Sequence, residues 1–132
     1  MIHFIDTNIF MYAVGQTHPY KDPSQMLINR ILQNEVAAAT NTEVLQEILY
    51  RYTAIDRVKV GFDLVDTILD TFPLIWPVTK EDVGLARRLQ ARFHIKTRDA
   101  IHAATMKNNT VTHLYSYDAD FDRLPGINRV LP

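Results

Sequence analysis

Cysteine is absent from the chain of 132 residues. Its absence excludes a disulfide scaffold, a thiol nucleophile and a zinc site built on thiolates, and it is compatible with a reducing compartment. The chain also lacks an excess of either charge, with 14 Lys and Arg against 15 Asp and Glu and a formal net charge of -1. We therefore expect no global attraction to nucleic acid, so any such binding needs a local basic patch or metal ions.

Long apolar runs are absent as well. The longest, such as residues 36–39 and 74–78, are far too short to span a bilayer, and Asp6 interrupts the first apolar run before a leader peptide can form. The hydrophobic content of 47% and the charged content of 22% are ordinary for a globular protein. We expect a single domain over residues 1–132 with a true core, and a cytoplasmic location.

Short apolar segments alternate with longer segments of helical periodicity. Strands are predicted over residues 2–5, 35–39, 74–78, 111–115 and 128–131, and helices over residues 8–14, 24–32, 42–52, 60–72, 79–93 and 97–104. Ser24, Asn41 or Thr42, and Thr97 are predicted helix caps, and the helix from Thr79 opens with what resembles a capping box. Strands that alternate with helices indicate a parallel sheet in a three-layer α/β fold.

Acidic residues follow the predicted strands or open the predicted helices. Asp6 comes directly after the first strand, Glu43 after the second, and Asp118 after the fourth. Asp99 lies in the first turn of the helix that leads into that fourth strand. Ligands of open parallel sheets bind beyond the carboxyl ends of the strands, so we expect these four carboxylates to meet at one edge of the sheet.

Each acid also has a purely structural explanation. Asp6 can cap the helix that follows it, and acids near helix starts, such as Glu43 and Asp99, complement the helix dipole. The acidic loop that begins at Asp118 can be a simple polar turn. These explanations do not require all four acids to lie at the same end of the sheet, so the joint pattern favours a functional site.

Clustered carboxylates repel one another, and some take up protons unless a cation neutralises them. Oxygen-only ligands suit Mg²⁺ or Mn²⁺, and such a site is suited to phosphodiester hydrolysis. The five histidines do not form a zinc site, because only His102, three residues after Asp99, lies near a candidate acid on a helix. Packing or hydrogen bonding is the alternative role of His102.

Four segments together resemble one known family. They are DTNIF at 6–10, TEVLQEI at 42–48, RDAIHAA at 98–104 and SYDADF at 116–121. They are similar, in the same order, to the motifs of the PIN-domain ribonucleases, and most similar to those of the single-domain VapC-type toxins of toxin–antitoxin pairs. The resemblance covers nearly the whole chain, and it implies a Rossmann-like α/β/α sandwich.

The resemblance also implies a function and a set of residues. The positions that match the family's metal-binding and catalytic acids are Asp6, Glu43, Asp99 and Asp118, and those that match its supporting residues are Asp120, Asn8 and Ser116. We expect Mg²⁺- or Mn²⁺-dependent endonucleolytic hydrolysis of RNA, with Glu43 as a direct or water-mediated ligand of the metal. The expected partners are a cognate antitoxin and a second copy of the chain in a homodimer.

Basic and aromatic residues are candidates for contact with RNA. Arg92, Lys96 and Arg98, from the segment ARRLQARFHIKTRD, can follow the phosphates, and a solvated helix face is the alternative. The tyrosines that can stack on bases, with packing as their alternative role, are Tyr12, Tyr20 and Tyr117.

Other functions also stay open. A non-catalytic interaction module of the same fold would show no Mg²⁺-dependent cleavage, and a nuclease acting on DNA would use the same metal site. A dinucleotide binder has little support, because no GxGxxG follows the first strand. A phosphotransferase with Asp6 as its nucleophile has little support either, because Asn8 stands two residues later where a second acid is needed.

Overall fold

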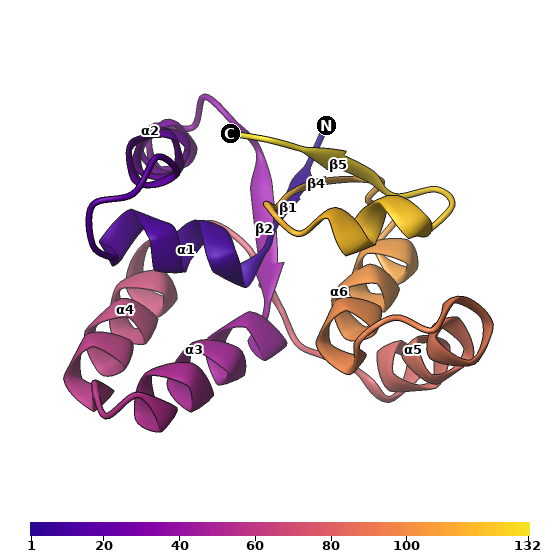
Figure 1. Ribbon diagram of the computed structural model, residues 1–132. Coiled ribbons are helices and arrows are strands. Elements are labelled where there is room, and N and C mark those ends of the chain that lie inside the picture. The colour runs from indigo at the N-terminus through magenta and orange to yellow at the C-terminus, as the bar shows by residue number, and fades with distance from the viewer.

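Five parallel strands form the sheet, in the order β3-β2-β1-β4-β5 (Figure 1). The structure, a computed structural model, describes all 132 residues. The strands are β1 (His3–Ile5), β2 (Ala38–Asn41), β3 (Ile75–Trp76), β4 (His113–Tyr115) and β5 (Asn128–Val130). From β1 the chain first builds outward through β2 to β3 and then returns to the other side of β1, so the strand order reverses between β1 and β4. Such a reversal opens a crevice at the carboxyl ends of the two strands.

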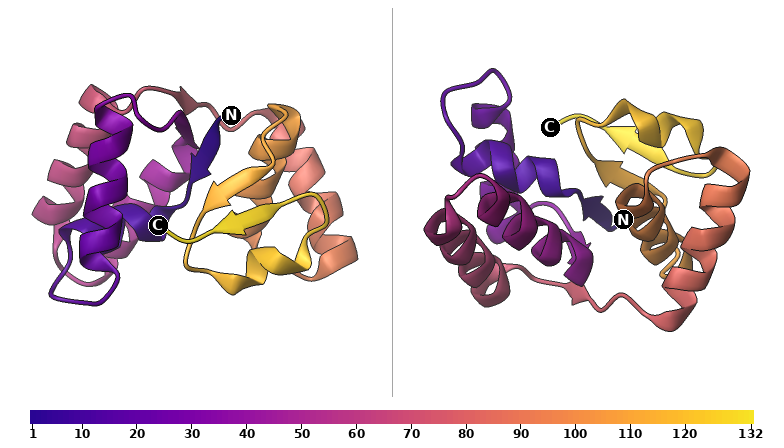
Figure 2. Two further views of the ribbon diagram at one scale, coloured as in Figure 1. Left: turned by 90° about the horizontal axis from the view of Figure 1, so that it is seen from above. Right: turned by 60° about the horizontal axis from the view of Figure 1, so that its bottom comes forward.

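Helices cover both faces of the sheet. They are α1 (Thr7–Val14), α2 (Lys21–Leu32), α3 (Thr42–Ala54), α4 (Val58–Thr71), α5 (Lys80–Phe93) and α6 (Thr97–Asn108), and a 3-10 helix η1 spans Ala119–Arg123. Helices α1 to α4 lie on one side and α5 and α6 on the other, as the views of Figures 1 and 2 agree. The predicted three-layer α/β/α sandwich is therefore confirmed. No helix combines the length and the apolar character needed to cross a membrane.

The central strand is buried on both faces. Phe4 and Ile5 of β1 are fully buried, which is why this short run carries no alternation of polar and apolar residues. Helix α6 packs closely because it offers small side chains, with Ala100, Ala103 and Ala104 all fully buried. Burial of each large apolar side chain contributes about 1.5–3 kcal/mol, so the core holds β1 and α6, and the acids at their ends, in a fixed relation.

The second strand lies later in the chain than predicted. It spans Ala38–Asn41 rather than residues 35–39, because two polar residues are buried with their hydrogen bonds satisfied. The Thr40 hydroxyl donates to the carbonyl of Ile5, and the Asn41 amide donates to the hydroxyl of Thr105. The apolar pattern alone could not include these residues, and Asn41 also caps α3, as predicted.

Several helix and strand ends also differ from the prediction. Helix α2 begins at Lys21, so Ser24 is a buried residue inside the helix and not its cap; proline in the first turn, here Pro23, is compatible with this start. Lys96 is the N-cap of α6, and Thr97 is its first residue. Strand β3 keeps only two residues of the predicted segment. The capping box between Thr79 and Asp82 at the start of α5 is present as predicted.

Candidate metal centre

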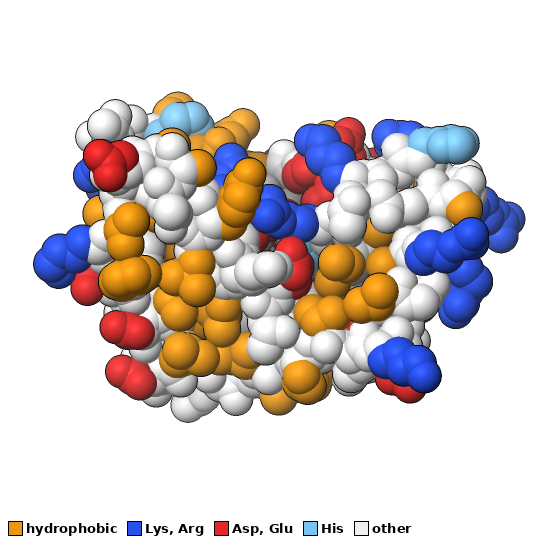
Figure 3. Space-filling model, turned by 90° about the horizontal axis from the view of Figure 1, so that it is seen from below, with side chains coloured by type: hydrophobic (Ala, Val, Ile, Leu, Met, Phe, Trp, Pro, Cys, Tyr) orange, Lys and Arg blue, Asp and Glu red, His pale blue; other side chains and the backbone are white.

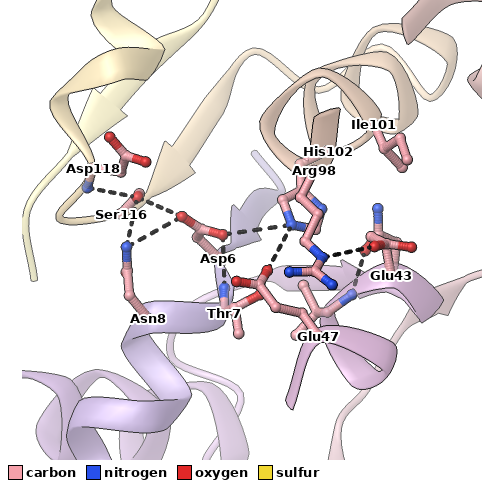
Figure 4. A network of polar contacts seen from close by, with 12 residues as sticks. Asp6, Thr7, Asn8, Glu43, Glu47, Arg98, Ile101, His102, Ser116 and Asp118 are labelled. Atoms are coloured by element: carbon pink, nitrogen blue, oxygen red, sulfur yellow. Dashed lines mark hydrogen bonds and ion pairs between the residues drawn. The ribbon is translucent and has the colours of Figure 1, made fainter. Parts of the chain in front are cut away.

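Asp6 and Ser116 meet in the crevice at the strand-order reversal. Asp6 follows β1 and Ser116 follows β4, and the Ser116 hydroxyl donates a 2.6 Å hydrogen bond to Asp6 Oδ2. The Asn8 amide donates to the same oxygen at 3.3 Å and to Ser116 Oγ at 3.2 Å (Figure 4). The other oxygen of Asp6 accepts the N–H of Thr7 at 2.8 Å, which caps α1. Asp6 is thus buried and held in one orientation.

Three further carboxylates gather next to this crevice. One oxygen each of Asp99, Asp118 and Asp120 lies within 4.8 Å of the other two. Asp118 is held by the loop, because its N–H donates to Ser116 Oγ at 2.9 Å and its Oδ1 accepts the N–H of Asp120 at 2.9 Å. Asp99 is 9% exposed, and its Oδ2 is buried without a hydrogen-bond partner. A buried carboxylate oxygen without a donor is in the state expected of a metal ligand.

The electrostatics of the cluster also favour a cation. Burial, together with the charges of Asp118 and Asp6, raises the pKa of Asp99 from 3.8 to about 7. Burial also raises the pKa of Asp6, against the opposing effects of His102 and the Ser116 hydroxyl. Carboxylates that resist ionisation together accept a hard divalent cation readily, because the ion replaces the missing positive charge. The donor set contains only oxygens and therefore fits Mg²⁺ or Mn²⁺.

Glu43 does not lie with this cluster. It occupies the first turn of α3, where its Oε1 pairs with Arg98 Nε at 3.3 Å, and Figure 4 shows it at the far side of the network from Asp118. The guanidinium of Arg98 also lies over the ring of Tyr50, 4.8 Å from its centroid. Glu43 thus lies at the predicted edge of the sheet, directly after β2, but it pairs with Arg98 and does not join Asp99, Asp118 and Asp120.

Glu47, one helical turn further along α3, lies in the crevice instead. Its Oε1 accepts the Thr7 hydroxyl at 2.8 Å and lies 3.7 Å from His102 Nε2, and Arg51 pairs with its Oε2 at 3.4 Å. Burial opposes its charge, but the attraction of His102 and the Thr7 hydrogen bond leave the pKa of Glu47 below its ordinary value. The segment TEVLQEI contains both Glu43 and Glu47, and the prediction from the sequence was Glu43, the acid nearer to the end of β2.

His102 is fully buried between two of these acids. Its Nε2 lies 3.7 Å from Asp6 Oδ1 and 3.7 Å from Glu47 Oε1. Burial alone would lower the pKa of His102, but the carboxylates of Glu47 and Asp6 raise it above its ordinary value. The imidazole is therefore a contact of the acidic centre and not merely a packed core residue.

The predicted basic residues reach different parts of the molecule. Lys96 Nζ lies 3.7 Å from Asp120 Oδ2, so it borders the acidic cluster. Arg98 is occupied by Glu43, and Arg92 lies against the ring of Phe93 in the last turn of α5. Figure 3 shows Lys and Arg side chains gathered over the α5 and α6 side of this face, hydrophobic side chains over the opposite side, and acidic side chains in the hollow between them.

A cleft of about 650 Å³ connects the acids with the surface. Asp6, Asp99, Asp118 and Glu47 line its acidic part. From there it extends along α1 towards the turn between α3 and α4. The residues in the crevice thus form an open, anionic and oxygen-rich site that a metal ion and a polymeric substrate can reach.

The sequence of this chain matches the model of the PIN domain over residues 3–127. The chain belongs to the PIN-domain family. It is 39% identical over 127 residues to Ribonuclease VapC13 of Mycobacterium tuberculosis, covering 96% of this chain and 97% of that protein. It is also 34% identical over 116 residues to Ribonuclease VapC23 of the same species, covering 87% and 91% of the two chains. Within the PIN-domain family the chain therefore groups with the VapC ribonucleases.

A solved structure shares the fold at lower sequence identity. The structure of Mycobacterium tuberculosis VapC20, described as a toxin that cleaves the sarcin–ricin loop, superimposes with a TM-score of 0.81 at 19% identity and covers 100% of both chains. This likeness independently confirms the PIN fold.

Proposed function

We propose that this PIN-domain protein is a Mg²⁺- or Mn²⁺-dependent endoribonuclease. The observation that carries the proposal is the cluster of Asp99, Asp118 and Asp120. One oxygen of each lies within 4.8 Å of the other two, and one buried oxygen of Asp99 has no donor. The names of its relatives as ribonucleases support RNA as the substrate.

The proposed ligands of the metal are Asp6, Asp99 and Asp118, with Asp120 as a supporting acid. When bound, a divalent cation supplies charge neutralisation and Lewis-acid activation for phosphodiester hydrolysis. Glu47 is the acid of α3 that we propose for the site in place of Glu43, because it borders Asp6 and lines the cleft.

The surrounding residues hold these acids in place. Ser116 and Asn8 fix Asp6 by hydrogen bonds to Oδ2. Substitution of residues that orient a metal ligand in this way typically lowers metal affinity or activity 10- to 100-fold. Lys96, exposed and next to Asp120, is suited to contact a substrate phosphate. Arg98 and Arg92 have weaker claims to this role, because each is engaged elsewhere.

Cleavage of RNA by the purified protein tests the proposal. Cleavage should require added Mg²⁺ or Mn²⁺, stop with EDTA and fall by about 100-fold in Asp99→Asn. Asp63→Asn is the matched control, since Asp63 is an exposed acid of α4 paired only with Lys59. Failure of the wild type to cut any RNA with either metal, or full activity of a folded Asp99→Asn variant, would refute the proposal.

The same assay separates the alternatives. A non-catalytic PIN module would bind partners without any metal-dependent cleavage. A metal-dependent nuclease that acts on another nucleic acid would cut single-stranded DNA at least as fast as RNA. The site does not select between the sugars by geometry, so both substrates belong in the assay. We also propose a cytoplasmic location, because a ribonuclease that acts on cellular RNA meets its substrate there.

We also propose that a cognate antitoxin inhibits this protein. Solved structures of the same fold include VapBC2 of Rickettsia felis bound to a DNA fragment from its promoter, with a TM-score of 0.76 at 20% identity. On this chain, an apolar groove of about 290 Å³ lies between α1, α2 and α4. Phe10 and Phe72 meet edge-on in it, with ring centroids 5.4 Å apart. Such a groove fits an apolar segment of a protein partner.

Coexpression with the product of an adjacent small reading frame tests the antitoxin. The two proteins should copurify, and the complex should be inactive on RNA. Leu32→Asp, at an exposed position of the groove, should weaken the complex without slowing cleavage by the free protein. An equally tight complex with Leu32→Asp would exclude the groove as the contact. We further propose that the free protein is a homodimer. Light scattering of the protein purified without the antitoxin measures its molar mass, which should be that of a dimer.

A further inference from the structure

Four aromatic side chains gather at the surface beside the acidic centre. This aromatic platform consists of Tyr12 from α1, His18 and Tyr20 from the segment before α2, and Tyr117 from the loop after β4. The rings of Tyr20 and Tyr117 stack with centroids 3.8 Å apart and 6° between their planes. Tyr12 meets Tyr20 and Tyr117 edge-on at 5.2 and 5.4 Å, and His18 lies 4.7 Å from both Tyr12 and Tyr20.

The platform is joined directly to the metal centre. Tyr117 stands between Ser116 and Asp118 in the chain, and its N–H donates to Asn8 Oδ1 at 3.3 Å. Asn8 in turn donates to Asp6. Each of these contacts ties the position of the rings to the acids that we propose as metal ligands.

The platform also borders the cleft that contains the acids. Tyr12 and His18 line the same 650 Å³ cleft as Asp6 and Asp118. Tyr20 is 40% exposed and His18 is exposed as well, so their rings are available to a ligand. The same cleft is also lined by Arg57, a cation at the turn before α4.

We propose that the aromatic platform binds a nucleobase of single-stranded RNA next to the scissile phosphate, with Arg57 contacting the backbone. This role rests on the proposed function, of which it names the substrate form. Aromatic rings stack on any base, and arginine attracts phosphate irrespective of sequence. With a net charge of -1, the protein gains little affinity from overall charge, so stacking has a correspondingly large share. Bases inside a duplex present no free face, which favours single strands.

Binding of short labelled RNA, measured by fluorescence anisotropy in an Asp99→Asn background that prevents cleavage, tests this role. The probes are a single-stranded oligoribonucleotide of mixed sequence, an abasic oligomer of the same length, and the corresponding duplex. The parent protein should bind the single strand about tenfold more tightly than the abasic oligomer. Equal affinity for these two probes would overturn the proposal whatever the variants do.

Two variants locate the effect on the platform. His18→Leu combined with Tyr20→Leu should weaken binding of the single strand about tenfold and leave binding of the abasic oligomer unchanged, whereas Tyr20→Phe keeps the ring and should bind like the parent. Phe62→Leu is the matched control, because Phe62 is an exposed aromatic residue of α4 that lines neither cleft nor groove. An equal loss for both probes would instead mean that the rings merely hold the loop, and would refute base stacking.

Cleavage assays distinguish failure of this role from failure of the proposed function. If His18→Leu combined with Tyr20→Leu raises the KM for single-stranded RNA in the wild-type background, both the stacking role and the ribonuclease function hold. If RNA is cut with an unchanged KM, the stacking role fails and the ribonuclease function stands. If the protein binds bases through the platform but cuts no RNA with Mg²⁺ or Mn²⁺, the ribonuclease function fails and the stacking role stands.

Discussion

The hydroxyl of Ser116 donates a 2.6 Å hydrogen bond to Asp6, although the two residues are 110 positions apart in the chain. The same hydroxyl accepts the Asn8 amide and the N–H of Asp118. One side chain therefore joins the ends of β1 and β4, the two strands between which the strand order reverses. The proposed metal centre depends on this junction, because the Ser116 hydroxyl orients Asp6 and positions the loop of Asp118.

Ser116→Ala should weaken Mn²⁺ binding about tenfold and slow RNA cleavage by a similar factor, because Asp6 loses the shortest of the three hydrogen bonds that hold its orientation. The variant also leaves the part-buried N–H of Asp118 without its acceptor and removes one of the two acceptors of the Asn8 amide, so its free energy of unfolding should fall by about 1–3 kcal/mol. Isothermal titration with Mn²⁺ and urea unfolding measure the two effects. Unchanged Mn²⁺ affinity in a folded Ser116→Ala protein would show that the junction does not orient the ligand.

Glu47→Gln should reduce cleavage 10- to 100-fold, and by more than Glu43→Gln does. Glu47 lies 3.7 Å from His102, which also contacts Asp6, whereas Glu43 is paired with Arg98 away from the cluster. The two substitutions are chemically identical and lie on the same helix, so each is the control for the other. Single-turnover cleavage rates at saturating Mg²⁺ make the comparison, and a greater loss in Glu43→Gln would return the role to the residue predicted from the sequence.

Much of the fold could be predicted from local patterns. The buried strand before Asp6, the capping box at Thr79 and the Asn41 cap of α3 depend on neighbouring residues alone, and the structure contains all three. The end of β2 could not be predicted in this way. Thr40 is a polar residue in a buried strand, and it is satisfied only by the carbonyl of Ile5, a residue 35 positions away.

The same division applies to the site. Asp6, Asp99 and Asp118 were predictable because strand ends and helix starts converge at one edge of a parallel sheet, and the structure brings them together. The choice between Glu43 and Glu47 could not be predicted from the sequence. Both acids lie on one side of α3, a helical turn apart, and only the position of Arg98 and Thr7 in three dimensions decides which one enters the crevice.

Gly61→Ala should destabilise the protein by about 1–3 kcal/mol. Gly61 is buried where α4 crosses α3, and an added Cβ would lie 2.8 Å from Tyr52 Cβ, which is backbone-anchored and cannot swing away. An alanine in an exposed helix normally stabilises relative to glycine, so a loss isolates the steric conflict. Urea unfolding measures it. Gly84→Ala in α5, where the nearest atom is the end of a flexible Arg88 side chain at 3.8 Å, is the matched control and should be neutral or stabilising.

The stability of the metal-free protein should depend on pH through Asp99. Its pKa is 3.8 in an ordinary environment and about 7 in the folded protein, because burial and the charges of Asp118 and Asp6 disfavour its ionised form. Folding therefore retains a proton that the unfolded chain releases between these pH values. The stability is fully present below pH 4 and is lost as the pH rises towards 7, by no more than about 4 kcal/mol.

Asp99→Asn removes this dependence because an amide stays neutral at every pH. In EDTA, the variant should match the wild type in free energy of unfolding near pH 4 and exceed it near pH 8. Added Mn²⁺ should reverse the order at pH 8, since a bound cation favours the ionised carboxylate that only the wild type offers. Urea unfolding at the two pH values, with and without Mn²⁺, measures all four differences. A wild type that stays the more stable at pH 8 in EDTA would mean that Asp99 is neutralised by the protein itself and not by a metal.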